Sequence, residues 1–253
     1  MNKFILSILA LFLFGALIIS GFVLFRSNQR IPDGEAGLPA ETLRDEIERA
    51  VNIEDWNEMA ALEFTFAFNQ NHHFMDIKRG FVEVQFKQDA DTFLVQYDEK
   101  GNARASMNHI QLSGDDLGYA FKKAKSFHNN DLFWLNPIAF LRDNTRIKKI
   151  GNQALLVTFL NKNNDTYLIV TDKNKRPTHW KMWTEQISLK GMESSFENWQ
   201  QIKNSKALVS LEHKNDFQKI VFTDVIGYNA YPPPGQKDRF LNFKGGSSRI
   251  TGD

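Results

Sequence analysis

The side chains in this sequence that could do chemistry are histidines and carboxylates, because its 253 residues include no cysteine. Disulfides, thiolate metal sites and a cysteine nucleophile are therefore excluded. Imidazole and carboxylate groups are suitable ligands for zinc or iron and can also act as acid–base catalysts. The candidate residues for such a centre are His72, His73, Asp76, His128 and Asp131. Adjacent residues of a strand point to opposite faces, so His72 and His73 cannot both be ligands there.

The alternative for these residues is a polar turn at 69–73 together with scattered surface histidines. We favour this alternative and expect no bound metal and no cofactor. Short catalytic motifs are also absent: no G-x-S-x-G, H-E-x-x-H, Walker A or dinucleotide-binding glycine pattern occurs. Most folds can carry a site without such a motif, so a histidine-dependent hydrolase stays open as a hypothesis.

Aromatic side chains are unusually frequent, with 22 phenylalanines against 5 tyrosines. Three stretches concentrate them: an alternating run at 62–68, a segment at 131–135 and a run at 178–184. In the third, Trp180 and Met182 share one face of a strand and Trp183 takes the other, as in a central strand under a covering helix. Aromatic and methionine side chains also suit a pocket for acyl chains. The candidate ligand-binding residues are Phe64, Phe66, Phe68, Phe133, Trp134, Trp180 and Met182.

The elements that must position these residues follow from hydrophobic periodicity. One helix is predicted from residue 40, with Leu43, Ile47 and Val51 on one face, and a second runs from 113 or 115 to 127. Runs that alternate with period two predict strands at 62–68, 82–86, 93–97, 104–107, 155–160, 167–172, 178–184, 207–213 and 220–225. The turns between them are too short for crossover helices, so neighbouring strands are antiparallel. The pattern predicts an α+β fold with a large twisted antiparallel sheet and helices against one face.

Residues 4–25 form an uncharged apolar run of 22 residues. At about 1.5 Å per residue, a helix of this length crosses a hydrocarbon core of roughly 30 Å. A cleaved signal peptide is the alternative, but its apolar core is normally about 7–15 residues and ends at a small-x-small site. We therefore predict a retained, single-pass transmembrane helix in the inner membrane, with the water-soluble part on the periplasmic side.

The chain is predicted to comprise a membrane anchor at 1–27, a linker at 28–39, one domain at 40–227 and a Pro/Gly-rich tail at 228–253. The prolines and glycines of the tail argue that it is extended and poorly ordered. The formal net charge of +1 gives no electrostatic reason to expect a nucleic-acid partner.

The strand order and a few aromatic positions resemble the periplasmic lipoprotein-carrier superfamily, the LolA/LolB/LppX-like proteins. The similar stretches are 62–68, 81–97, 131–135 and 167–183 with its turn at 172–174, within residues 40–226. The resemblance implies an incomplete barrel around an apolar cavity for acyl chains, with helices as its lid. A retained anchor departs from a diffusing carrier, and no residue here matches a carrier's handover residues, so a tethered receptor is expected.

These patterns lead to two functional hypotheses of different classes. The first is a membrane-anchored binder of a lipid, a lipoprotein acyl chain or another apolar ligand. The second is a structural or interaction subunit of an envelope complex, in which the aromatic residues form only the core. Replacing Phe64 or Phe66 with alanine distinguishes the two hypotheses. Loss of a phenylalanine ring from a packed core lowers the free energy of unfolding by about 3–5 kcal/mol. Truncation of a phenylalanine that lines a cavity should lower it by less than about 2 kcal/mol.

Overall fold

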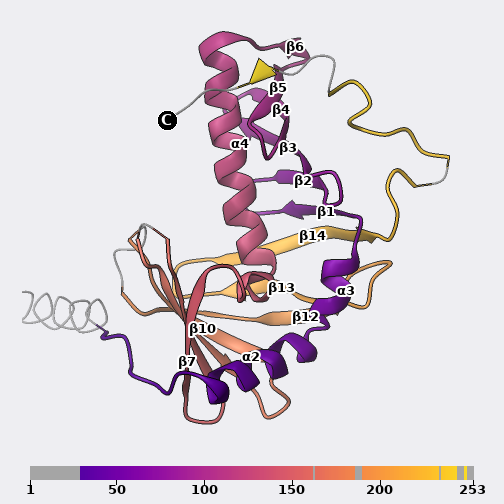
Figure 1. Cartoon of the computed structure of the whole chain (residues 1–253). Helices are drawn as coiled ribbons and strands as arrows, with labels where there is room; N and C mark the ends of the chain where they lie inside the picture. The colour runs from indigo at the N-terminus through magenta and orange to yellow at the C-terminus, as the bar shows by residue number, and fades with distance from the viewer. Residues whose placement is uncertain (1–28, 162, 186–189, 234, 244–247, 250–253) are drawn as a thin grey trace, which may run out of the picture. The chain divides into compact units, whose positions relative to one another are not determined.

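The computed structural model describes residues 29–161, 163–185, 190–233, 235–243 and 248–249 (Figure 1). The transmembrane helix predicted at 4–25 lies outside these residues. Within them, no helix combines the length and the apolarity needed to span a membrane.

The chain forms two compact units, each described here by itself. One consists of Met1–Arg44 with Asp143–Ser195, and the other of Asp45–Arg142 with Phe196–Asp253. The chain passes from the first unit to the second within helix α2 (Leu38–Ala50). Because the crossing lies inside a helix, no Pro/Gly-rich linker marks it in the sequence, and the predicted boundaries gave no sign of it.

The second unit is built on one sheet of ten antiparallel strands. Their order is β12-β13-β14-β1-β2-β3-β4-β5-β15, with β6 paired to β5, so the sheet is open. The predicted α+β class with a large antiparallel sheet is confirmed. The strands are β1 (Ala61–Phe66), β2 (Asn71–Asp76), β3 (Phe81–Gln88), β4 (Asp91–Asp98), β5 (Asn102–Met107), β6 (Ile110–Gln111), β12 (Glu197–Gln201), β13 (Leu208–Lys214), β14 (Lys219–Tyr228) and β15 (Ser248–Arg249).

Side chains of the central strands alternate between the two faces of this sheet, as a period of two requires. One face packs beneath helix α4 (Gly114–Leu135). The other, which we call the outer face, carries Glu63, Phe74 and Glu83 and contacts the C-terminal segment. The face below α4 is apolar along most of its length, and its buried residues include Leu62, Phe64, Phe66, Val84, Phe86, Phe93, Val95, Ala103 and Ala105.

Helix α4 runs across the strands, from β5 at one side of the sheet toward β13 (Figure 1). Its buried stripe repeats every three or four residues: Leu117, Ala120, Phe121, Ala124, His128, Asp131 and Leu135. Asp115 and Asp116 lie in the first turn, where the partial positive charge of the helix end favours carboxylates. The helix continues through the aromatic segment at 131–135, which the sequence pattern had placed after the helix. It ends before the 3-10 turn η1 (Pro137–Phe140), because proline disfavours helical geometry in the preceding residue.

The first unit contains a five-stranded antiparallel sheet of order β11-β10-β9-β8-β7. Trp180 and Met182 are buried on one face of β10, and Trp183 packs with Leu156 and Leu168 on the other. β10 lies between β11 and β9, and the burial of Trp180, Met182 and Trp183 shows that both of its faces are covered. The strands are β7 (Thr145–Ile150), β8 (Ala154–Phe159), β9 (Thr166–Thr171), β10 (Pro177–Trp183) and β11 (Met192–Ser195). Between α2 and β1, α3 (Ile53–Glu58) belongs to the second unit.

The described part of the C-terminal segment packs on the large sheet, so the expectation of a poorly ordered tail was wrong there. Phe240 and Phe243 are buried in a cluster with Phe74 and Phe81. Further on, β15 pairs with β5. The prediction failed because it weighed the prolines and glycines and overlooked two phenylalanines whose burial holds the segment in place.

We predict that Phe64→Ala destabilises the second unit by about 3–5 kcal/mol, because a void replaces close ring contacts. The Phe64 ring stacks on His73 at 4.6 Å between centroids and lies 6.2 Å from Phe222. Phe68→Ala is the matched control and should change stability by less than about 0.5 kcal/mol, since Phe68 is 57 % exposed. Urea denaturation measures both. Because the ring is packed while α4 is docked, a loss of about 3–5 kcal/mol for Phe64→Ala fits a lipid binder with α4 closed as well as a structural subunit. A loss below about 2 kcal/mol for Phe64→Ala would show instead that the ring borders a cavity.

Candidate functional site

Helix α4 and strand β2 bring four polar side chains together inside the apolar interior. Asn71 and His73 are two residues apart on β2, so both face α4. His128 and Asp131 are three residues apart on α4, so both lie in its buried stripe. We call Asn71, His73, His128 and Asp131 the buried polar cluster, since all four side chains are buried.

The Asp131 carboxylate is the acceptor at the centre of the buried polar cluster. Its Oδ2 atom accepts hydrogen bonds from Asn71 Nδ2 at 2.9 Å and from His73 Nε2 at 2.8 Å. Its Oδ1 atom accepts a third from Asn130 Nδ2 at 2.9 Å. Hydrogen bonds to a carboxylate are the means by which a protein compensates for its lost hydration. Asp131 therefore ties α4 to β2.

The two imidazoles of the cluster form a relay with defined donor roles. His73 donates from Nε2 to Asp131, so a neutral His73 presents an acceptor at Nδ1. His128 Nδ1 lies 3.4 Å from that atom and donates to it. Aromatic rings enclose the pair: Phe64 stacks on His73, and Tyr97 meets His128 edge to face at 6.4 Å between centroids.

The surroundings hold both histidines neutral. Burial lowers the pKa of His73 below its ordinary value of 6.5, although the hydrogen bond to Asp131 opposes the shift. Burial, and after it the neighbouring His73, lower the pKa of His128 to about 3. Burial also raises the pKa of Tyr97, whose hydroxyl has no hydrogen-bond partner among the described residues. At neutral pH the cluster thus contains two uncharged imidazoles.

The structure brings together part of the metal or acid–base group considered from the sequence. His73, His128 and Asp131 meet, whereas His72 and Asp76 lie on the outer face, as alternation along β2 requires. The three side chains bond to one another instead of pointing to a shared centre, and the described residues hold no metal-binding group of three such side chains. His128 is only 4 % exposed, so a substrate could reach it only by entering beneath α4.

Two of the predicted ligand-binding residues lie beside the buried polar cluster. Phe64 and Phe66 are buried under α4, and their rings lie 6.2 and 5.4 Å from that of Phe222. The sequence did not connect them to His73, because β2 lacks an apolar alternation and was interpreted as a turn. The pairing of β1 with β2 creates the contact, since Phe64 and His73 are direct neighbours in the register.

The other five predicted ligand-binding residues do not join this site as closely. Phe133 and Trp134 are half-buried at the end of α4, and Trp134 packs against the same core as Phe64. Phe68 is exposed in the turn after β1. Trp180 and Met182 are buried in the other compact unit.

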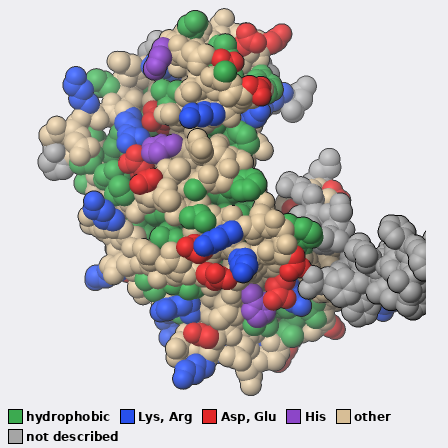
Figure 2. Space-filling model, turned by 180° about the vertical axis from the view of Figure 1, so that it is seen from behind, with side chains coloured by type: hydrophobic (Ala, Val, Ile, Leu, Met, Phe, Trp, Pro, Cys, Tyr) green, Lys and Arg blue, Asp and Glu red, His purple; other side chains and the backbone are tan. Residues whose placement is uncertain are grey.

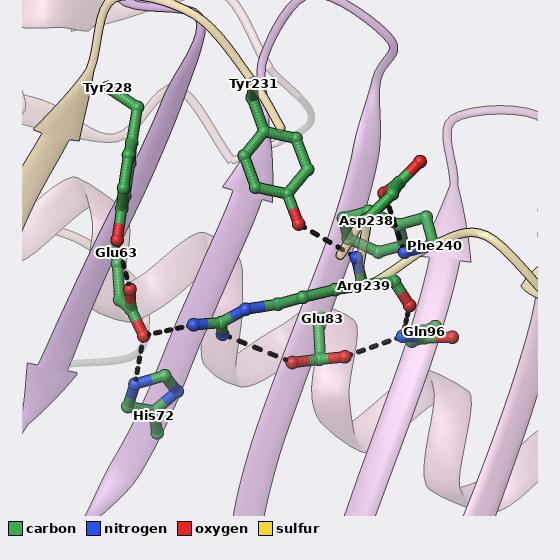
Figure 3. A network of polar contacts seen from close by, with 9 residues as sticks. All are labelled: Glu63, His72, Glu83, Gln96, Tyr228, Tyr231, Asp238, Arg239 and Phe240. Carbon is green, nitrogen blue, oxygen red and sulfur yellow. Dashed lines mark hydrogen bonds and ion pairs between the residues drawn. The ribbon is translucent and has the colours of Figure 1, made fainter. Parts of the chain in front are cut away.

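A second polar network, missed by the sequence reasoning, lies on the outer face (Figure 3). Glu63 Oε1 is 3.0 Å from His72 Nε2 and accepts a hydrogen bond from Arg239 Nη2 at 2.7 Å, while Tyr228 donates to Glu63 Oε2 at 2.8 Å. Burial would raise the pKa of Glu63, but the hydrogen bonds from His72, Arg239 and Tyr228 outweigh it and lower the pKa to about 2. Seen from behind, the described surface has basic and acidic side chains interspersed (Figure 2).

An open pocket of about 350 Å³ lies elsewhere in the second unit. Its lining is polar and includes Asp55, Glu58, Asn204 and Lys206. This lining differs from the aromatic surroundings expected for an apolar ligand.

The chain is only weakly similar to known proteins. No protein-family model matches it, and the search of curated proteins found no match. Among solved structures, it is similar to an outer membrane lipoprotein-sorting protein domain from Vibrio parahaemolyticus, with 14 % identity and a TM-score of 0.36. The match covers 80 % of this chain and 97 % of that one. This weak resemblance does not assign the chain to a family.

We predict that acid destabilises the second unit through its buried histidines. Because the folded pKa values of His73 and His128 lie below the ordinary value of 6.5, their stabilising contribution is complete above that pH. Stability should fall as the pH decreases from 6.5 toward about 3, since the unfolded chain takes up protons that the folded chain excludes. Urea denaturation at neutral and at mildly acidic pH measures the effect.

The variant His128→Gln, which cannot titrate, should flatten this pH dependence by up to about 1.4 kcal/mol per pH unit. His109→Asn is the matched control, because His109 is exposed in the turn after β5. An unchanged pH dependence in His128→Gln would contradict the assignment.

Proposed function

We propose that the large sheet and helix α4 bind a lipid, an acyl chain or another apolar ligand between them, with α4 as a movable cover. One observation carries the proposal: this apolar interface contains a buried polar site. The sheet offers an apolar face broken by Asn71 and His73. Opposite them, His128 and Asp131 interrupt the stripe of α4 that covers this face.

The sheet side of the interface has the chemistry of a platform for acyl chains. The rings of Phe86 and Phe93 stack at 4.9 Å across neighbouring strands. Ala103 and Ala105 belong to the same buried cluster, so flat rings lie beside small side chains. Covering such a surface is favourable by about 25 cal/mol per Å² of apolar area, whether a helix or a ligand covers it.

Helix α4 can move away from the sheet at a lower cost in free energy than a helix with a uniformly apolar stripe. A buried leucine or phenylalanine contributes about 1.5–3 kcal/mol to docking, and His128 and Asp131 occupy two positions where such residues would stand. When α4 moves away, water hydrates both polar groups, which offsets the loss of their hydrogen bonds. The cluster therefore fixes where α4 docks without making the docking as strong as a uniformly apolar stripe would.

The membrane is the proposed source of the ligand. We propose that the apolar run at 4–25 tethers the protein to the inner membrane by a single span, with the compact units on the periplasmic side. A tethered binder takes up lipid or a lipoprotein acyl chain at the membrane instead of diffusing with it. We therefore favour a receptor over a shuttle, with an envelope protein as partner.

We predict that locking α4 to the sheet abolishes ligand binding. Because the chain has no cysteine, two cysteines placed across the α4–β5 interface can pair only with each other. Ala120 of α4 and Ala105 of β5 are the positions to replace, because both are buried in the same cluster. In protein beginning at Gln29, the oxidised form should bind no fluorescent fatty-acid probe, and the reduced form should bind it as the unmutated protein does. Fluorescence titration and native mass spectrometry for retained lipid measure this.

The reduced protein is the matched control, since it has the same sequence as the oxidised one. Equal probe binding in both forms would show that the ligand does not enter beneath α4. No probe binding and no retained lipid in the unmutated protein would contradict the function itself.

A second function is favoured by exposed apolar side chains at hairpin turns. Phe68, Ile110 and Phe217 are 57, 69 and 68 % exposed. The register places the turns after β1, β5 and β13 at the same end of the large sheet. Exposed apolar groups at one end of a sheet are available for contact with another protein. In that case the protein is a non-catalytic interaction subunit of an envelope complex, and the residues under α4 are only its core.

A further inference from the structure

The C-terminal segment from Tyr228 to Phe243 is held on the outer face of the large sheet by side chains from several strands (Figure 3). Apart from residue 234, these residues are described, and none after Tyr228 up to Phe243 belongs to a strand. The segment is therefore recognised mainly through its own side chains, as a bound peptide is, and not through a strand-to-strand ladder.

Arg239 is the residue on which this recognition centres. Its Nη2 donates to Glu63 Oε1 at 2.7 Å, and its Nη1 donates to Glu83 Oε1 at 3.5 Å. Its guanidinium carbon lies 4.2 Å from the centroid of the Phe74 ring. Two carboxylates beside an aromatic face bind a planar guanidinium better than they bind any other side chain.

The residues on either side of Arg239 are bound just as specifically. Asp238 accepts two hydrogen bonds from the Arg79 guanidinium, at 2.6 and 2.8 Å. Phe240 and Phe243 are buried, and their rings lie 5.3 and 5.2 Å from that of Phe81. An acidic residue, an arginine and two aromatic residues spaced three apart thus each have a partner on the sheet.

Two side chains of the sheet donate hydrogen bonds to the main chain of the segment. Gln96 Nε2 donates to the Arg239 carbonyl at 3.0 Å, and Arg104 Nη1 donates to the Asn242 carbonyl at 3.2 Å. The join to the sheet is open to solvent, because Asn229 and Ala230 are both exposed. The contacts of residues 238–243 do not depend on that join.

We propose that the outer face of β1–β4 is a recognition surface for a peptide of the form acidic–Arg–aromatic–x–x–aromatic, which the chain's own residues 238–243 occupy. The partner is a protein that carries such a segment and binds by displacing the chain's own. Glu63 and Glu83 select the arginine, Arg79 selects the acidic residue, and Phe74 and Phe81 receive the aromatic rings. This surface lies on the face opposite α4, so this proposal stands apart from ligand binding beneath that helix.

Cleaving the chain between β14 and the segment tests whether an added peptide can replace the chain's own segment. A protease site introduced between Asn229 and Ala230 in the full chain, held in lipid nanodiscs, allows cleavage after folding. A fluorescent peptide of residues 230–253 is then added and its anisotropy is followed. Saturable binding is expected, and a peptide with Arg239→Ala should bind at least about tenfold more weakly because charge-assisted hydrogen bonds are lost. A Leu241→Ala peptide is the matched control and should bind normally, since Leu241 is 72 % exposed.

The uncut chain with Arg239→Ala provides a second route to the same answer. Its weakened segment should give way to the natural peptide, whereas the unmutated uncut chain should bind far less. The proposal is overturned if the cleaved chain and the Arg239→Ala chain stay folded but bind no peptide, or if the Arg239→Ala peptide binds as tightly as the natural one. If cleavage unfolds the second unit, the uncut Arg239→Ala chain decides in the same way.

Discussion

The position of α4 on the large sheet depends on the carboxylate of Asp131 and the hydrogen bonds that it accepts. Burying a carboxylate costs free energy unless hydrogen-bond donors replace its hydration. Removing one donor leaves part of this desolvation cost uncompensated. Two of the three donors, from Asn71 and His73, stand on β2. The helix can therefore dock in one place only, where these donors reach it. Apolar contacts alone would tolerate a shift along the sheet, because the hydrophobic effect has no direction.

The two faces of the sheet show how one alternating sequence serves two different purposes. Beneath α4 the strands present apolar side chains broken by the single polar site on β2. On the outer face the same strands present Glu63, Glu83 and Gln96 among phenylalanines, which suits an arginine-bearing segment. His72 and His73 illustrate the division, since one faces the outer network and the other the buried polar cluster.

Much of the fold could be predicted from period-two alternation, and the exceptions have physical reasons. The strand predicted at 82–86 is β3 and that at 93–97 is β4, because the alternating apolar residues of both strands all face α4. Strand β2 was missed because its buried positions hold polar groups that partners satisfy: Asn71 and His73 on one face and Asp76 on the other. A single sequence does not reveal such partners, since Asp131 is 58 residues from His73 along the chain.

The sequence predicted only part of the candidate site, because it does not show which side chains are partners in the fold. His73, His128 and Asp131 could be grouped by residue type, but their mutual hydrogen bonds depend on the helix phase of α4 and the register of β2. Helix α4 itself was predicted to end at 127, because His128 and Asp131 break its apolar stripe. The residues that obscured the helix are the ones that fix it to the sheet.

The proposed function requires that α4 opens locally while the sheet stays folded. Native-state hydrogen exchange measures this directly, because amides exchange through local opening at lower free energy than through global unfolding. We expect the amides of α4 to exchange faster than those of β1–β4 at neutral pH, and a bound fatty acid to slow the exchange of the α4 amides. Exchange of α4 at the same free energy as the central strands, unchanged by fatty acid, would contradict the proposed function.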